Sequence, residues 1–219
     1  MFETAVVDGV LRLARPDTEW LSTGVGGGRA RGDAAYNVTV PEGFERTDLS
    51  AYLEERLAAA GFEPDGPALL TGVEMRHARG ARDGPAVAYA TAGLSNPAAL
   101  PAEHAGTVNV LVGTTRSLDA GALATLLGVA VEAKAATLLG AAGVPGTTTD
   151  AVVVGCDPRG EPATFAGSAT EVGASARACV RAAVRASLRS RYPDGEYPAS
   201  VAAAEHGVRT ERRPETFRP

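Results

Sequence analysis

The stretch TVNVLVGTTRSLDAGALATLLGVAVEAKAATLLGAAGVPGTTTDAVVVG, residues 107–155, decides the fold of this chain. Thr107–Val112 is apolar, rich in β-branched residues and has the length of a strand. Leu118–Ala142 is long and rich in Ala and Leu, which predicts a helix. A Gly-Thr-rich turn, Gly146–Asp150, then leads into a second apolar run, Ala151–Val154. The stretch therefore predicts a strand, a long helix, a polar turn and a second strand.

The ends of the predicted helix are marked by residues that favour helix boundaries. Ser117 is placed to cap its amino end, with Asp119 in the first turn. Gly143, followed by Pro145, ends the helix, because glycine adopts the left-handed conformation of a helix stop and proline does not continue a helix.

Lys134 is the unusual residue of this helix. At about 100° per residue it falls near the centre of an apolar face, whereas Glu132 points the opposite way. It is the only lysine among 21 Lys and Arg residues, which suggests that the site requires an ammonium. An ammonium can lose its proton when removed from water, whereas a guanidinium stays charged. Two simpler readings remain, namely a stem packed on apolar surface with its amine in water, or a plain ion pair. The apolar face comprises Leu123, Leu126, Leu127, Ala130, Val131 and Leu138.

Length and composition bound the class of protein. A chain of 219 residues can bury a large core as one domain. The net charge of -5 argues against nucleic-acid binding, and no basic run with interleaved aromatics reverses this. Cys156 and Cys179 form no CxxC pair, which favours a reduced, cytoplasmic protein. Glu3 and Asp8 lie where a signal peptide would be basic and apolar, and no uninterrupted apolar run reaches transmembrane length, so we expect no membrane association.

The amino-terminal part predicts strands. Thr4–Leu13 reads as a hairpin around Asp8-Gly9, because Asp-Gly supplies the positive φ of a two-residue turn. Gly24–Gly28 predicts a loop whose backbone amides can approach a ligand, although a plain flexible loop explains it equally well. Ala35–Val40 alternates like a strand and stops at Pro41.

The next segment predicts one helix and two strands. The helix spans Leu49–Ala60, between Asp48 as cap and Gly61. Two strands follow, joined by what reads as an exposed hairpin loop, and a polar, Pro-punctuated loop after them is able to cover a site. These segments are Ala68–Met75, Pro85–Thr91, the hairpin loop Arg76–Gly84 and the covering loop 92–106.

The carboxyl-terminal part predicts a second long helix, from about Gly173 to Arg191. Arginines at every fourth position give this helix one basic stripe. Like charges at this spacing repel, so the stripe requires solvent, acidic partners or an anion, and a solvated face is the favoured interpretation. Residues 193–219 read as a loosely packed arm with a short strand near Val208, and residues 1–192 as the domain. The stripe consists of Arg177, Arg181, Arg185 and Arg189.

The order of elements indicates the fold class. Strands come first in hairpins, a strand–helix–strand unit follows, and a helix closes the chain. This order predicts a single-domain α+β fold with a mixed, partly antiparallel sheet and long helices packed on it.

Two polar turns can support chemistry. Gly146–Asp150 offers three hydroxyls, backbone amides and a carboxylate, which together can hold an oxyanion and move a proton. Glu171 follows a second turn of small residues, and we expect the two turns to form two walls of one cleft. Each turn taken alone is equally typical of simple capping. The histidines lack metal-site spacing and no GxSxG occurs, which leaves a water or hydroxyl nucleophile served by a lysine or a carboxylate.

Several motifs, in this order, resemble those of the adenosylcobinamide amidohydrolase (CbiZ) family over roughly residues 20–190. Thr148 stands where the family resemblance leads us to expect glycine, and Val25 where we expect an aromatic residue. The resemblance implies hydrolysis of the amide that joins aminopropanol to the corrin ring of adenosylcobinamide, giving adenosylcobyric acid for cobalamin biosynthesis. The motifs are Leu21-Ser-Thr-Gly24 with Gly26-Gly27, Asn37, Gly106-Thr-Val-Asn109-Val, Glu132-Ala-Lys134, Gly146-Thr-Thr-Thr-Asp150, and Ala166-Gly167 with Thr170-Glu171-Val-Gly173.

We assign roles within this reaction as hypotheses. Asp150 is the general base on water, Thr147 and Thr149 hold the oxyanion, and Lys134 protonates the amine or steadies the negative charge. A variant makes Thr149 or Ser22 the nucleophile, with Lys134 as its base. No cofactor is expected because the corrinoid is the substrate, and a carboxylate-held divalent metal stays open. The expected substrate-binding residues are Ser22, Thr23, Gly24, Gly26, Gly27, Asn37, Asn109, Gly146 and Glu171.

Two other classes of function compete with this one. A corrinoid-binding protein without turnover needs the same cleft but neither Lys134 nor Asp150. A phosphotransferase could use the Thr-rich turn for phosphate, although the chain lacks GxxxxGK[ST]. Nucleic-acid and membrane partners are not expected, and self-association stays open.

Overall fold

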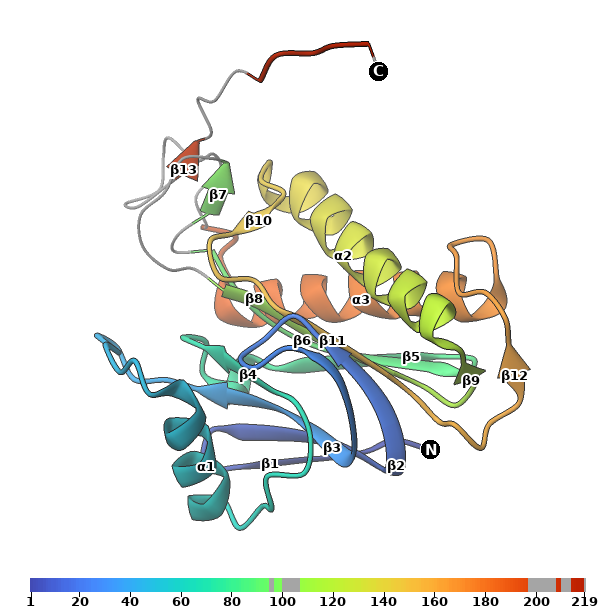
Figure 1. Ribbon diagram of the computed structural model, residues 1–219. Coiled ribbons are helices and arrows are strands. Elements are labelled where there is room, and N and C mark those ends of the chain that lie inside the picture. Colours follow the sequence, from blue (N-terminus) through green and yellow to red (C-terminus); the bar gives the residue numbers. More distant parts are fainter. Residues whose placement is uncertain (95–96, 100–106, 197–207, 210–213, 219) are drawn as a thin grey trace.

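A computed structural model describes residues 1–94, 97–99, 107–196, 208–209 and 214–218 of the chain. Its main feature is a curved eight-stranded sheet in the order β4-β3-β2-β11-β8-β6-β5, with β1 paired to β2 (Figure 1). The strands are β1 Glu3–Val7, β2 Val10–Ser22, β3 Gly28–Thr39, β4 Ala68–Thr71, β5 Arg79–Asp83, β6 Ala86–Gly93, β8 Thr107–Thr114 and β11 Val152–Cys156.

Three α-helices and several short elements complete the fold. The long helices α2 and α3 pack against each other on one face of the sheet, and α1 lies beside β3 and β4 (Figure 1). The helices are α1 Leu49–Ala59, α2 Ala120–Ala142 and α3 Glu171–Arg191, with a 3-10 turn at Met75–His77. The short strands are β7 Pro97–Ala99, β9 Ser117–Leu118, β10 Gly146–Thr147, β12 Pro162–Ala163 and β13 Val208–Arg209.

Pairing within the sheet is mixed. β8 and β11 run parallel, as do β3 and β4, and the remaining neighbours are antiparallel. Helices and a partly antiparallel sheet therefore confirm the predicted single-domain α+β class. The predicted short strand near Val208 is also present, since β13 pairs with β7.

The amino-terminal hairpin follows from its turn. Asp8 and Gly9 have φ values of 46° and 78°, the left-handed pair that a two-residue turn requires. β2 then continues to Ser22, well beyond the predicted Leu13, and pairs with β11 at its far end. One long strand thus joins the hairpin to the central unit.

Three predicted segments differ from the structure. β3 begins at Gly28, in a polar run that reads as loop from sequence, and the strand predicted to reach Met75 ends at Thr71. The predicted loop Arg76–Gly84 contains β5, an edge strand whose polar side chains face water. Such an edge strand resembles a loop in sequence because its charged residues interrupt the apolar alternation that predicts a strand. The predicted covering loop 92–106 lies largely outside the described residues.

Helix α2 begins two residues later than predicted. Asp119, rather than Ser117, is its cap, with its carboxylate accepting a hydrogen bond from the Ala122 amide. Gly143 ends the helix in the left-handed conformation, as predicted. Val131 was expected on the apolar face, but it is 39% exposed because the buried face lies toward Ala133 and Lys134.

The sheet has a core on each face. Alanines and valines of β6, β8 and β11 pack under α2 and α3. On the other face the sheet curls so that β2 and β3 cover β6, β8 and β11, around the fully buried Trp20. Gly155 permits this closure, because a Cβ there would lie 2.3 Å from the Trp20 ring.

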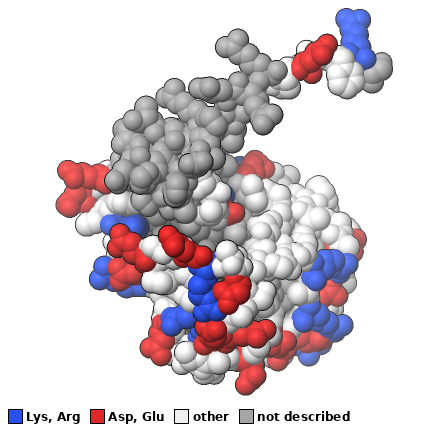
Figure 2. Space-filling view, turned by 60° about the vertical axis from the view of Figure 1, so that its left-hand side comes forward, with Lys and Arg blue, Asp and Glu red and all other residues white. Residues whose placement is uncertain are grey.

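Among the described residues, α2 alone is long and apolar enough to cross a membrane, although half of its most apolar window is buried. A core helix packed on a sheet has the same composition. On the face shown in Figure 2, acidic and basic side chains are interspersed.

Candidate active site

The predicted pair of Lys134 and Asp150 forms in the structure. Lys134 projects from the middle of α2 toward the sheet, and Asp150 lies in the turn between β10 and β11. The Nζ of Lys134 donates to Oδ2 of Asp150 in a close ion pair. The two side chains are only 7% and 10% exposed. Burial of both charges in direct contact makes this the strongest candidate for chemistry among the described residues.

Asp150 accepts four hydrogen bonds from the part of the chain that the structure describes. Its Oδ2 accepts from Lys134 and from the Thr147 amide at 3.1 Å. Its Oδ1 accepts from the Thr147 hydroxyl and from the Val108 amide at 2.8 Å. The carboxylate therefore ties together α2, the polar turn and the start of β8.

The turn brings Thr147 and Asp150 together because Gly146 leaves room. A Cβ at Gly146 would lie 2.6 Å from Oδ2 of Asp150 and 3.6 Å from Nζ of Lys134. Any side chain there would push the carboxylate off its partners. Gly146 thus leaves the space that the ion pair needs, whereas the sequence predicted this glycine only as a substrate contact.

The Thr149 hydroxyl extends the site toward solvent. The Oγ1 atoms of Thr149 and Thr107 lie 2.9 Å apart, and Thr149 is exposed. Thr147 is only 8% exposed. The predicted hydroxyl-lined turn is therefore real, with Thr149 on its open side. Thr107 and the Val108 amide are members that sequence reasoning missed, although their position at the start of a strand preceding the helix is the signal that could have found them.

Asn37 and Asn109 form a buried network instead of an open surface. The Asn109 amide group donates to Oδ1 of Asn37 at 2.9 Å and to the Leu70 carbonyl at 2.8 Å, and the Asn37 amide group donates to the Thr91 hydroxyl at 2.9 Å. Both residues are at most 1% exposed. The expected direct contact with substrate is not supported, because protein groups occupy these amides. Asn109 instead accepts from the Ala151 amide at 3.1 Å, next to Asp150.

The predicted glycine loop lies beside the site. The Thr23 amide donates to the Val152 carbonyl at 3.0 Å, and the Val152 amide donates to the Thr23 hydroxyl at 2.9 Å. Ser22 is 6% exposed, and its hydroxyl accepts from the Gly24 amide at 3.0 Å. The loop is therefore fixed to the strand that follows Asp150.

A groove of about 400 Å³ opens next to this loop, between it and α1. Gly24 leaves no room for a side chain, since a Cβ there would lie 2.4 Å from the Leu69 side chain. A Cβ at Gly27 would likewise lie 2.7 Å from the carbonyl oxygen of Ser22. The groove is lined in part by Ser22, Val25, Gly26, Gly28, Leu53 and Leu57.

Glu171 lies away from this site. Its carboxylate accepts from Arg116 at 2.6 Å, beyond the carboxyl end of β8, whereas Asp150 is bonded at Val108 near the amino end. Six strand residues separate these points by roughly 20 Å. The two predicted polar turns therefore do not form two walls of one cleft. Thr170, not Glu171, caps α3 by accepting from the Gly173 amide at 3.1 Å.

A second buried carboxylate, Asp157, follows β11. Burial raises the pKa of Asp157, but hydrogen bonds from the Arg159 amide and the Arg15 guanidinium outweigh it and hold that pKa below its ordinary value. Burial raises the pKa of the Cys156 thiol and raises that of Cys179 to about 11. The described residues contain no group of three His, Cys, Asp or Glu placed to hold a metal ion.

Comparison with known proteins assigns the family. The family model described as adenosylcobinamide amidohydrolase matches residues 3–196. The chain belongs to the adenosylcobinamide amidohydrolase family. This confirms the resemblance predicted from the motifs, and it makes the chain an amidohydrolase whose family acts on adenosylcobinamide.

Two curated members of the family are similar over most or all of their length. The chain is 57% identical over 233 aligned residues to the adenosylcobinamide amidohydrolase of Halobacterium salinarum, with 100% of both chains covered. It is 33% identical over 189 residues to the adenosylcobinamide amidohydrolase of Methanosarcina mazei, which covers 82% of this chain and 94% of that protein. No solved structure matches the chain significantly.

Proposed function

We propose that this enzyme hydrolyses the amide between aminopropanol and the corrin ring of adenosylcobinamide. The products are adenosylcobyric acid and free aminopropanol, which makes the reaction a salvage step toward cobalamin. Family membership over residues 3–196 supports the substrate. The observation that carries the chemistry is the buried Lys134–Asp150 pair beside two threonine hydroxyls.

Asp150 is the proton carrier of the proposed reaction. Of its four donors, Lys134 and two backbone amides are fixed, whereas the hydroxyl hydrogen of Thr147 can turn away. A water that takes this place donates its proton to Asp150 as its oxygen bonds to the amide carbon. The carboxyl group then passes that proton to the departing nitrogen as the C–N bond breaks.

The remaining polar groups stabilise charge. The Lys134 ammonium stays beside the carboxylate and offsets the negative charge that develops on the amide oxygen. The released Thr147 hydroxyl and the exposed Thr149 hydroxyl donate to that oxygen. The Lys134–Asp150 pair is already assembled before substrate binds, and such preorganisation is what makes electrostatic stabilisation effective.

The glycine loop and its groove provide the proposed corrin contact. Thr23 joins the loop to Val152, so a ligand seated against Gly24–Gly28 lies next to the polar turn. Val25, Leu53 and Leu57 give the groove an apolar wall. The proposed reaction uses no added cofactor, and we propose a cytoplasmic enzyme because its two cysteines are free thiols.

The direct test is turnover by the purified protein. Adenosylcobinamide should yield aminopropanol and adenosylcobyric acid, and in H₂¹⁸O one labelled oxygen should enter the new carboxylate without a protein adduct. A trapped acyl-enzyme would replace water by a threonine or serine nucleophile. Binding of adenosylcobinamide with no release of aminopropanol would establish the competing, non-catalytic function.

Two isosteric variants test the assigned roles. Asp150→Asn removes the proton acceptor and should lower kcat by at least about a hundredfold, the usual size of a general-base contribution. Glu132→Gln, on the exposed side of the same helix, should keep the parent rate. Full activity of folded Asp150→Asn would refute the proposed proton transfer.

A further inference from the structure

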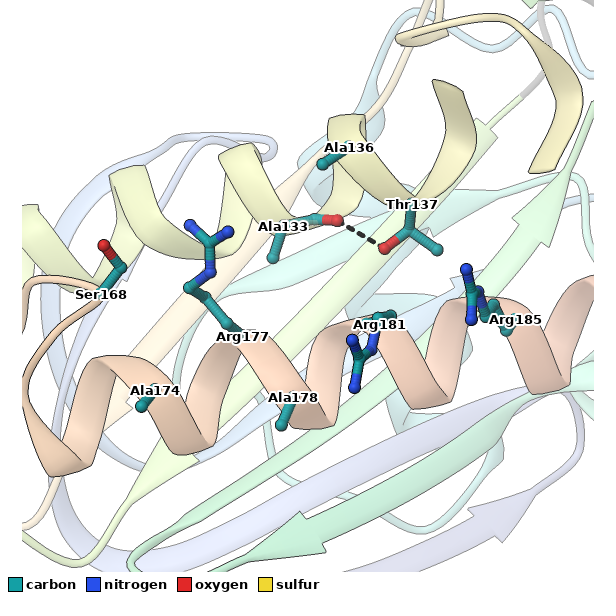
Figure 3. Close-up of a pocket in the computed structure, with 9 residues that line it drawn as sticks. All are labelled: Ala133, Ala136, Thr137, Ser168, Ala174, Arg177, Ala178, Arg181 and Arg185. Atoms are coloured by element: carbon teal, nitrogen blue, oxygen red, sulfur yellow. Dashed lines mark hydrogen bonds between the residues drawn. The ribbon is translucent and has the colours of Figure 1, made fainter. Parts of the chain in front are cut away.

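A second hollow, distinct from the groove at the glycine loop, lies between α2 and α3 on the side away from the sheet. It encloses about 430 Å³. Figure 3 shows three arginines spaced along α3 beside the small residues of both helices, with Thr137 pointing down between them. The hollow exists because alanines take the place of larger side chains there. Its lining is Ala133, Ala136, Thr137, Ser168, Ala174, Arg177, Ala178, Arg181 and Arg185.

The charge of this hollow is positive, although the chain as a whole carries -5. Arg177 donates to the Glu132 carboxylate at 2.5 Å, which balances one of the three guanidinium groups. Arg181 and Arg185 are exposed and have no hydrogen bond or ion pair with the residues that the structure describes. Two unbalanced positive charges therefore border one cavity.

The arrangement works against the stability of the isolated helix. Successive arginines on α3 are four residues apart, about 6 Å along the axis, so their like charges repel. A solvated basic face would show the same repulsion. What sets this stripe apart is that two of its arginines without a partner among the described residues, Arg181 and Arg185, line one hollow between two helices.

The geometry points to a binding site for a small phosphorylated molecule in this hollow. Guanidinium groups present planar forks of N–H donors that match phosphate oxygens, and one phosphate can accept from two arginines a helical turn apart. The volume is that of a small-molecule pocket. The site is separate from the proposed catalytic pair, because Lys134 projects from α2 toward Asp150 and does not line the hollow.

Inorganic pyrophosphate is the probe for this site. Isothermal titration of the full chain at low salt should give binding at one site, since screening weakens exposed charge pairs. Arg181→Gln and Arg185→Gln should each weaken binding about tenfold, the effect of one charge-assisted hydrogen-bonding group. Arg189→Gln is the matched control, because Arg189 lies one turn further along α3 and does not line the hollow. It should change the affinity less than about twofold.

Three results would overturn the proposal. In the first, pyrophosphate fails to bind the parent protein. In the second, Arg189→Gln weakens pyrophosphate binding as much as Arg181→Gln does, which would indicate general electrostatic attraction. In the third, a polyglutamate peptide binds through Arg181 and Arg185 while pyrophosphate does not, which would identify an acidic protein segment as the partner. Because none of these readouts involves amide hydrolysis, they stand apart from the test of the proposed function.

Discussion

Replacing Lys134 by Met tests whether the buried ion pair holds the polar turn in place. The side chains of Lys134 and Asp150 are 7% and 10% exposed, so water screens their charges little. Removing one partner of a buried pair typically costs about 3–5 kcal/mol. Asp150 keeps three donors, two from Thr147 and one from Val108. The expected loss is therefore near the lower end, about 3 kcal/mol.

Urea unfolding can measure this loss through the fluorescence of the single, fully buried Trp20. The double variant Lys134→Met with Asp150→Asn should cost at least about 1 kcal/mol less than the sum of the two single variants, because their charges are coupled. Glu132→Gln is the control, two residues away on the same helix. Its pair with Arg177 is 60% and 36% exposed, so its loss should stay below about 1 kcal/mol.

The result that would refute this reasoning is specific. If Lys134→Met unfolds within about 1 kcal/mol of the parent, or if the two single losses add fully in the double variant, the pair does not stabilise the turn. The preorganised site on which the proposed hydrolysis depends would then need another explanation.

Three further predictions follow from the structure. Gly146→Ala should lower hydrolysis at least about tenfold by displacing the Asp150 carboxylate, whereas Gly140→Ala, with open space around it, should keep the rate and stabilise α2 by up to about 1 kcal/mol. Because the folded pKa of Asp157 lies below its ordinary value, its contribution to stability is present above pH ~4 and is lost as pH falls through the folded pKa. The urea midpoints of the parent and Asp157→Asn should therefore differ at pH 7 and converge in acid. A difference between the two midpoints that is the same at pH 7 and in acid would contradict this. The two buried cysteines, with raised thiol pKa values, should react with a thiol reagent at pH 8 only after unfolding, and rapid labelling of the native protein would disagree.

The central unit and the contact between Lys134 and Asp150 could be predicted from the sequence because both depend on local periodicity. A β-branched run, a long Ala-Leu helix and a second β-branched run specify β8, α2 and β11 in order. The helical projection placed Lys134 on the buried face, and its partner there is the carboxylate of the turn that follows the helix. Local rules also placed the Asp8-Gly9 hairpin and the stop at Gly143.

The errors arose where contacts join distant segments. Two similar polar turns look equivalent in sequence, but parallel pairing of β8 with β11 places Asp150 and Glu171 at opposite ends of the strands. The amides of Asn37 and Asn109 satisfy each other only because the sheet curls, and no local pattern encodes that curl. The edge strand β5 read as a loop because its exposed side carries charges.

Lys134 and Asp150 lie 16 residues apart, yet the whole length of α2 beyond Lys134 must form and dock before they meet. In a nascent chain whose strands have formed but whose α2 has not yet packed on the sheet, the Lys134 amine and the Asp150 carboxylate are separately exposed to water. Such a chain has not assembled the site that we propose for hydrolysis. The proposed reaction therefore requires that the helical layer has closed over the sheet, and a partly folded molecule should not turn over substrate.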